Sequence, residues 1–200
     1  MCGIVGVVST RPVGFIMLEG LQRLEYRGYD SAGLAVVNER GALERIRRVG
    51  KVAELRNAFT ENPIAAQMGI AHTRWATHGK PSELNAHPHV SHERVYIVHN
   101  GIIENYVKLK EGLEKKGYEF KSETDSELIA HQLDAFLSKK TNMLEAMSLL
   151  KEKLEGAYAI AAVDLNHKDQ LVIARYKSPL LIGVGIEENL SLIHISEPTR

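Results

Sequence analysis

Directly after Met1, residues 2–8 of the chain read CGIVGVV, a run of β-branched apolar residues interrupted by glycines. Such a run predicts a buried strand that starts at the chain end. A terminus that is part of a sheet is held in place. Gly3 would let the backbone or a substrate approach the neighbouring thiol closely. The segment therefore predicts a cysteine fixed at the end of a buried strand.

Cys2 is the only cysteine of the 200 residues. Because its side chain is small, we expect Met1 to be removed, which would leave a thiol and an α-amine on one residue. A cysteine thiol has a pKa of roughly 8.5, and an α-amine titrates at roughly 7.7–8.0. A partly neutral amine can accept the thiol proton, which would make Cys2 a nucleophile with its own base. A small buried hydrophobic residue is the alternative interpretation.

The composition indicates one domain with a substantial core. Lys plus Arg and Asp plus Glu each number 25, so the formal charge of zero does not favour a nucleic-acid or anionic-membrane partner. No apolar run approaches the ~20 residues of a membrane span, and the N-terminus lacks the features of a secretory signal. We therefore expect a cytoplasmic enzyme with no nucleic acid or membrane partner.

The order of the expected elements indicates an α+β fold. Strands come first, two adjacent helices follow, and strands return at the end, which suits two packed sheets with helices outside. Helices are expected at residues 12–24, 103–116, 124–137 and 142–154, from their apolar spacing and terminal glycines. Residues 124–127 (TDSE) predict a capping box at the start of the third helix. Strands are expected at residues 3–8, 32–37, 43–49, 69–72, 95–99, 157–163, 171–175 and 180–184.

Two polar segments border expected strands. Residues 26–33 (YRGYDSAG) contain residues typical of turns, so an ordinary turn is the first interpretation. Residues 72–79 (HTRWATHG) bring together an arginine, the only tryptophan and two histidines. Arginine is suited to bidentate capture of a carboxylate, and loops at strand ends often carry sites. This second segment favours a ligand site, with a solvated loop as the alternative.

Two further segments have both a structural and a functional interpretation. Asn100 and Gly101 are first of all a tight-turn signal. The Asn100 amide and the Gly101 N–H could also form an oxyanion hole. In residues 122–125 (SETD), Asp125 is favourable near a helix start in any case. Its functional role would be to bind a substrate ammonium group.

A dense group of histidines raises the question of a metal site. His87, His89 and His92 lie within six residues. The segment lacks the cysteine partners and the H-E-x-x-H spacing that make zinc specific, and Pro88 argues against a helix that would align ligands. No metal is expected.

Together, these segments resemble the class II, or N-terminal-nucleophile, glutamine amidotransferases. The matching segments are residues 2–6, 27–33, 72–79, 85–88, 99–101 and 122–125, in the order and spacing of that family. The resemblance covers the chain up to about residue 189. It implies a four-layer αββα sandwich of two mostly antiparallel sheets, and no organic cofactor or metal.

The resemblance also implies a mechanism in which L-glutamine is the substrate. Cys2 attacks the side-chain amide, and Asn100 and Gly101 hold the oxyanion. Arg74 binds the α-carboxylate of glutamine and Asp125 binds its α-ammonium group. Ammonia leaves, and water hydrolyses the remaining thioester.

Four more residues receive roles from the resemblance alone. Thr77 and His78 belong to a loop that closes over glutamine. Trp75 covers the site and governs where the ammonia goes. Arg27 lies near the site.

Within the class, the chain resembles most the family that makes glucosamine 6-phosphate from fructose 6-phosphate in a second, isomerase domain. The relatives that aminate phosphoribosyl pyrophosphate usually have glutamine in place of Tyr29, and tyrosine-serine in place of Trp75 and Ala76. A glutaminase domain of that second kind, or an inactive binding module of the same fold, is the alternative. The full-length enzyme is expected to be a homo-oligomer.

The resemblance ends near Asn189. We expect a C-terminally truncated glutaminase domain over residues 2–189, a non-native tail over residues 190–200, and no isomerase domain in this chain.

Overall fold

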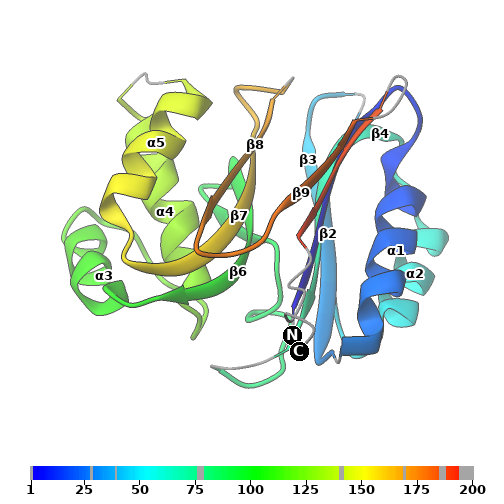
Figure 1. Cartoon of the computed structure of the whole chain (residues 1–200), viewed down its shortest axis with the longest axis horizontal. Coiled ribbons are helices and arrows are strands. Elements are labelled where there is room, and N and C mark those ends of the chain that lie inside the picture. The colour runs from blue at the N-terminus through cyan, green and yellow to red at the C-terminus, as the bar shows by residue number, and fades with distance from the viewer. Residues whose placement is uncertain are drawn as a thin grey trace.

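A computed structural model of the chain describes residues 2–27, 29–38, 40–75, 79–139, 142–168, 170–184 and 188–193. These residues form four layers, in the order helices, sheet, sheet, helices (Figure 1). Every pair of neighbouring strands in the two sheets is antiparallel. The predicted α+β fold with an αββα arrangement is therefore confirmed.

The larger sheet has six strands in the order β3-β2-β4-β1-β10-β9. The strand that directly follows Cys2, β1, lies in the interior of the sheet between β4 and β10. The strands are β1 (Gly3–Ser9), β2 (Ser31–Asn38), β3 (Leu43–Val49), β4 (Ala66–Arg74), β9 (Leu181–Val184) and β10 (Glu188–Ile193).

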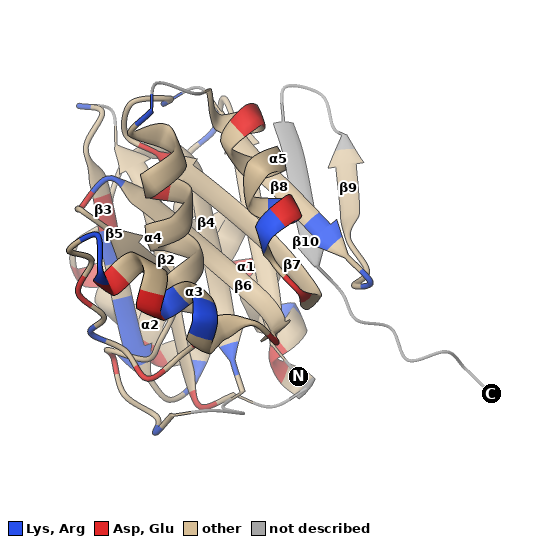
Figure 2. Cartoon of the chain, turned by 90° about the vertical axis from the view of Figure 1, so that its left-hand side faces the viewer, with Lys and Arg blue, Asp and Glu red and all other residues tan. Residues whose placement is uncertain are grey.

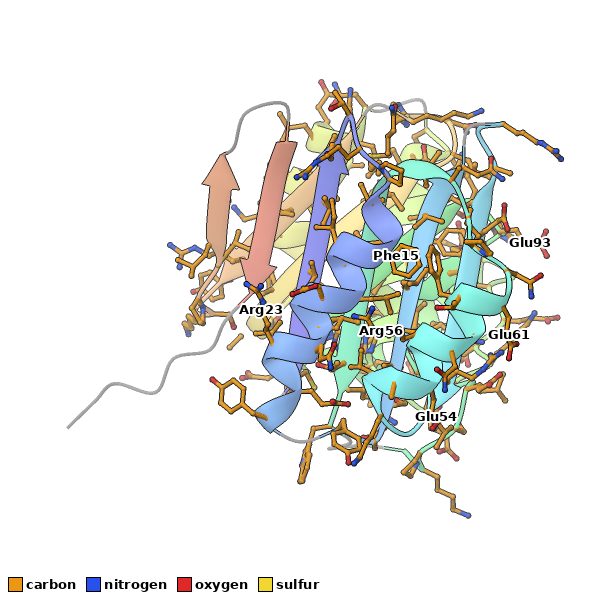
Figure 3. All side chains as sticks on the ribbon, turned by 90° about the vertical axis from the view of Figure 1, so that its right-hand side faces the viewer. Phe15, Arg23, Glu54, Arg56, Glu61 and Glu93 are labelled. Atoms are coloured by element: carbon orange, nitrogen blue, oxygen red, sulfur yellow. The ribbon has the colours of Figure 1, made fainter. Side chains whose placement is uncertain are left out.

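Helices α1 (Val13–Leu24) and α2 (Val52–Glu61) cover the outer face of this sheet (Figures 1 and 3). The two helices meet where the Phe15 and Phe59 rings pack edge to face, with centroids 5.3 Å apart. A short 3-10 helix, η1 (Glu25–Arg27), follows α1. Burial of apolar residues on one face of each helix explains why both form in this place.

The smaller sheet has four strands in the order β5-β6-β7-β8. Its strands are β5 (His89–Ser91), β6 (Val95–Ile103), β7 (Gly156–Asp164) and β8 (Leu171–Tyr176). Its outer face is covered by α3 (Tyr106–Glu114), α4 (Ser126–Leu137) and α5 (Met143–Lys153), on which basic and acidic residues are interspersed (Figure 2). None of the described helices is long and apolar enough to cross a membrane.

Three apolar layers hold the four structural layers together. In β1, Val5 and Val7 pack against the helices outside, whereas Ile4 packs between the two sheets. In β6, Ile97 packs toward α4 while Val98 faces the other sheet. Because successive side chains of a strand point to opposite faces, strands that are buried on both faces are continuous apolar runs.

The structure corrects several predicted boundaries. Ile103 belongs to β6, so the helix predicted at residues 103–116 begins only at Tyr106, and its Val107 is exposed. The predicted capping box is wrong, because the Glu127 carboxylate accepts hydrogen bonds from the N–H groups of Lys121 and Ser122. Thr124 instead contacts His89.

Four of the described elements were not predicted, namely α2, η1, β5 and β10. Helix α2 has a detectable signal in the spacing of Val52, Leu55 and Phe59, all of which are buried. Residues 190–193, which belong to the expected non-native tail, lie in β10 and pair with β1. The origin of that tail remains a prediction.

Candidate active site

Cys2 lies immediately before β1 and next to the end of β4. The Gly3 N–H donates to Thr73 Oγ1 at 3.1 Å, and the Trp75 N–H donates to Cys2 Sγ at 3.2 Å. A side chain at Gly3 would lie 2.9 Å from Leu24 Cβ. Gly3 therefore lets the helix and strand approach each other, and β4 positions the thiol.

The thiol of Cys2 is held in its protonated form. Burial raises the pKa of Cys2, although the hydrogen bond from the Trp75 N–H opposes that shift. Because the thiolate is the nucleophilic form, such a cysteine needs a base that removes its proton. Its own α-amine would be the nearest base once Met1 is removed.

Asn100, within β6, is fixed by two contacts. Its Nδ2 donates to the Cys2 carbonyl at 3.1 Å, and its Oδ1 lies 2.8 Å from His72 Nε2. His72 Nε2 also lies 3.1 Å from the His99 carbonyl. Both neighbours of this nitrogen are acceptors, so Nε2 carries the proton. His72 thereby holds the Asn100 amide with its NH₂ group toward Cys2.

His72 is fully buried, and this burial lowers its pKa to about 3. The ring is therefore neutral near pH 7, as the tautomer with the proton on Nε2 requires. The sequence interpretation did not assign a role to His72, although it is the first residue of the 72–79 segment.

Gly101 lies within β6 and not in a tight turn, so the turn interpretation of Asn100 and Gly101 is wrong. Its φ of +133° lies in a region that favours glycine. A Cβ at this position would collide with the Ala157 carbonyl oxygen on the neighbouring strand. The close packing of β6 on β7 therefore requires glycine at residue 101.

Arg74 ends β4 and is 4% exposed. Its Nη1 lies 3.3 Å from Asp30 Oδ1, and its Nη2 donates to the Gly79 carbonyl at 3.3 Å. The Asp30 N–H in turn donates to the Arg74 carbonyl at 2.7 Å. Asp30 belongs to the segment whose first interpretation was an ordinary turn, and its role as the partner of Arg74 was not predicted.

Asp125 lies at the N-cap of α4 but makes no side-chain cap hydrogen bond. Its Oδ2 accepts a hydrogen bond from the Ile103 N–H at 2.8 Å, and its Oδ1 lies 4.0 Å from His99 Nδ1. His99 Nδ1 also lies 2.9 Å from Ser126 Oγ. The carboxylate is thus held between the end of β6 and the start of α4.

One cavity brings these residues together. Five of the nine predicted site residues line this cavity. A sixth, Asn100, does not line it but donates a hydrogen bond to the carbonyl of Cys2, which does. Trp75 is 51% exposed and forms part of the wall. Thr77, His78 and the side chain of Arg27 lie outside the described residues. The lining residues are Cys2, Arg74, Trp75, His87, His99, Gly101, Thr124, Asp125 and Ser126.

The histidines that raised the metal question have separate partners. The His87 ring stacks on His72 with centroids 3.9 Å apart. His89 Nε2 lies 3.1 Å from Thr124 Oγ1, and His92 Nδ1 lies 2.7 Å from Asp134. Burial lowers the pKa of both His87 and His89. His87 and His89 are buried beside or against the cavity, whereas the His92 side chain is exposed.

The family described as glutamine amidotransferase domain matches residues 72–192. The chain belongs to this family. The match includes Arg74, Asn100, Gly101 and Asp125, and it confirms the resemblance drawn from the sequence.

Curated relatives of this glutamine amidotransferase domain include two proteins named glutamine–fructose-6-phosphate aminotransferase (isomerizing). The chain is 55% identical to the protein of Escherichia coli K12 and 53% identical to that of Pseudomonas putida, each over 189 residues. The alignments cover 94% of this chain and 31% of each relative. The chain therefore spans about a third of the length of these relatives.

A solved structure of glutamine phosphoribosylpyrophosphate amidotransferase from B. subtilis has the same fold. It superposes with a TM-score of 0.81 at 24% identity, over 96% of this chain and 41% of that chain. The structure titled as the allosteric regulatory enzyme of purine biosynthesis gives a TM-score of 0.83, also at 24% identity.

Proposed function

We propose that this domain hydrolyses the side-chain amide of L-glutamine through a thioester on Cys2. The observation that carries the proposal is the single cavity that contains the Cys2 thiol, the Arg74 guanidinium and the Asp125 carboxylate. A nucleophile flanked by one cation and one anion suits an amide substrate that is also a zwitterion.

The reaction begins when the α-amine of a processed N-terminus takes the proton of the Cys2 thiol. The sulfur adds to the side-chain carbonyl carbon of glutamine, and the carbonyl oxygen becomes an oxyanion. The Asn100 amide and the Gly101 N–H stabilise that oxyanion. The protonated α-amine then gives its proton to the leaving nitrogen, the carbon–nitrogen bond breaks, and ammonia departs. Water hydrolyses the thioester to glutamate and restores the thiol.

The remaining site residues recognise and enclose the substrate in this proposal. Arg74 binds the α-carboxylate and Asp125 the α-ammonium group. Trp75 covers the site and directs the ammonia, and Thr77 and His78 close over glutamine. Arg27 lies near the site in the same scheme.

The ammonia acceptor is fructose 6-phosphate in our proposal. Identities of 53–55% to the fructose-6-phosphate aminotransferases favour this acceptor over phosphoribosyl pyrophosphate, whose amidotransferase is 24% identical. The product would be glucosamine 6-phosphate, made in the cytoplasm by an isomerase domain of a full-length homo-oligomer.

Ammonia release from glutamine tests the first step. Purified protein with a processed N-terminus should release ammonia, and Cys2→Ala should abolish the release. Equal release by both proteins would contradict the mechanism, whereas a folded but inactive wild-type protein would favour a binding module.

Mass spectrometry of the intact protein tests the base. The mass should correspond to a chain that starts at Cys2. If Met1 is retained in active protein, the α-amine of Cys2 is part of a peptide bond, and another group must take the proton.

A further inference from the structure

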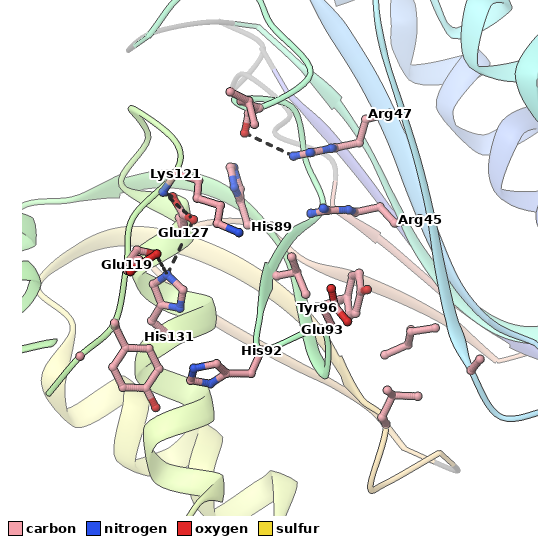
Figure 4. Close-up of a pocket in the computed structure, with 17 residues that line it drawn as sticks. Arg45, Arg47, His89, His92, Glu93, Tyr96, Glu119, Lys121, Glu127 and His131 are labelled. Carbon is pink, nitrogen blue, oxygen red and sulfur yellow. Dashed lines mark hydrogen bonds and ion pairs between the residues drawn. The ribbon is translucent and has the colours of Figure 1, made fainter. Parts of the chain in front are cut away.

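A second cavity, of about 790 Å³, lies where β3 and β5 approach each other between the sheets (Figure 4). It shares no lining residue with the Cys2 cavity. We call it the basic cleft, after Arg45, Arg47 and Lys121, which line it. Its volume lies within the ~300–1,000 Å³ that is typical of small-molecule sites.

Arg45 and Arg47 stand two residues apart on β3, so their side chains project from the same face of the strand. Figure 4 shows both guanidinium groups reaching into the cleft side by side. Arg45 Nη1 donates to the Pro88 carbonyl at 2.9 Å, and Arg47 Nη1 donates to the Ala86 carbonyl at 3.1 Å. These carbonyls orient the two groups but are uncharged.

Among the described residues, neither guanidinium forms an ion pair with a carboxylate. Arg48, on the opposite face of the same strand, pairs with Glu83 at 3.4 Å. Burial and, to a smaller extent, the neighbouring Arg45 lower the pKa of Arg47 to about 10, although Glu83 and Glu127 oppose that shift. Two partly buried cations that repel each other are destabilised unless an anion joins them.

The acidic residues of the cleft do not provide that anion. Both carboxylate oxygens of Glu127 accept hydrogen bonds from the backbone N–H groups of Lys121 and Ser122. Glu93 and Glu119 are exposed, as is Lys121. The interior of the cleft therefore has two oriented guanidinium groups, and no carboxylate of the described residues forms an ion pair with them, although Glu127 acts on both at longer range.

We propose that the basic cleft binds a small organic molecule through a phosphate group held by Arg45 and Arg47. Each guanidinium has five N–H donors in a planar arrangement, which matches the oxygens of a phosphate. Only one nitrogen of each group is used by the carbonyls. Tyr96 and Tyr118 also line the cleft and provide surface for the organic part. This proposal does not depend on the glutaminase function.

Calorimetric titration of the 200-residue protein tests the site with three probes: inorganic phosphate, ribose 5-phosphate and ribose. Phosphate should bind with a Kd near the millimolar range, ribose 5-phosphate should bind more tightly, and ribose should not bind. Absence of binding by both phosphate compounds would overturn the proposal. Binding of ribose equal to that of ribose 5-phosphate would also overturn it.

Variants then locate the binding. Arg45→Gln and Arg47→Gln keep a hydrogen-bond donor for the carbonyls, and each should weaken phosphate binding by about tenfold, since one charge-assisted contact is lost. Arg48→Gln, on the opposite face, should leave binding unchanged. Equal weakening by all three variants would indicate a general charge effect and overturn the site.

A chemical test on the unmodified protein covers the case in which the variants do not fold. Phenylglyoxal modifies accessible arginines, and mass spectrometry locates the adducts. Phosphate should slow modification of Arg45 and Arg47 but not of Arg48. Identical protection of all three arginines, or of none, would contradict the proposal.

Discussion

Arg74 in the Cys2 cavity and the arginine pair of the basic cleft show two ways in which this domain buries a cation. Arg74 Nη1 forms an ion pair with Asp30 Oδ1 at 3.3 Å. Arg45 and Arg47 have peptide carbonyls and, among the described residues, no carboxylate partner. A cation that already has a carboxylate suits a substrate that is neutral overall, such as a zwitterion. Two cations without a counter-charge suit an anion.

The two regions are joined by the chain segment 84–88. The carbonyls of Leu84, Ala86 and Pro88 accept hydrogen bonds from Arg45 and Arg47 on one side of the segment. On the other side, the His87 ring stacks on His72, which in turn contacts Asn100. Because one segment contacts both regions, a substitution in one region can be tested for its effect on ligand binding in the other.

Gly101→Ala should have the largest effect, and its structural cause lies on the Cys2 side. The new Cβ would collide with the Ala157 carbonyl, and the φ of +133° is unfavourable for alanine. We expect a loss of about 3 kcal/mol or more in the free energy of unfolding, together with loss of glutaminase activity. Chemical denaturation and ammonia release measure the two effects.

Gly112→Ala is the matched control for this change. A Cβ at Gly112 in α3 meets no atom within 4 Å. Alanine should stabilise the helix by about 0.5–1 kcal/mol. Similar destabilisation by both substitutions would mean that the strand geometry at Gly101 is not the cause.

Asn100→Ala should separate the two regions most clearly. Removal of one oxyanion donor should lower kcat by about 10²–10³ with a smaller effect on KM. Phosphate binding in the basic cleft should be unchanged, because Asn100 does not line it. Steady-state kinetics and calorimetry check both expectations, and a change in KM alone would argue against the oxyanion role.

Acid should destabilise both regions through their buried histidines. His72 and His89 have pKa values of about 3, because burial disfavours the charged ring. Below pH 6.5 the unfolded chain gains protons that the folded protein does not, so stability falls as the pH falls. The loss at about pH 5 should be about 2 kcal/mol for each such histidine.

Denaturation curves at a series of pH values measure this loss. His72→Gln should make the free energy of unfolding depend less steeply on pH. Added phosphate should also reduce this pH dependence. The positive charges of Arg45 and Arg47 contribute to the low pKa of His89, and an anion between them would offset that contribution. A flat stability between about pH 7 and pH 5 would contradict the buried neutral state of these rings.

Asp30→Asn should have the smallest effect and should make the two regions more alike. The variant removes the Asp30 carboxylate from its contact with Arg74. The KM for glutamine should rise about tenfold as the guanidinium loses its orientation, and phosphate should become a competitive inhibitor. Glu83→Gln, in the exposed pair with Arg48, is the control and should change stability by less than about 1 kcal/mol. If phosphate competes with glutamine in the wild-type protein, the proposed difference between Arg74 and the arginine pair of the basic cleft is wrong.

The elements that were predicted well are those with strong local signals. Apolar spacing predicted the strand after Cys2 and the helix at residues 12–24. The family resemblance implied the αββα arrangement. The capping box failed because Glu127 found backbone partners in Lys121 and Ser122. Helix α2 was missed because the three buried positions that identify it stand among polar residues.

The sequence by itself determined the chemical groups of this protein: the thiol of Cys2, the glycine at residue 101, and a set of segments characteristic of glutamine amidotransferases. Only the tertiary structure decided which groups have partners. Asp30 and Arg74 are 44 residues apart, and His72 and Asn100 are 28 apart. Pairing and burial at such separations depend on how the two sheets pack, and local spacing does not encode that packing. The same reason explains why Arg45 and Arg47, which have no carboxylate partner among the described residues, could be recognised only in three dimensions.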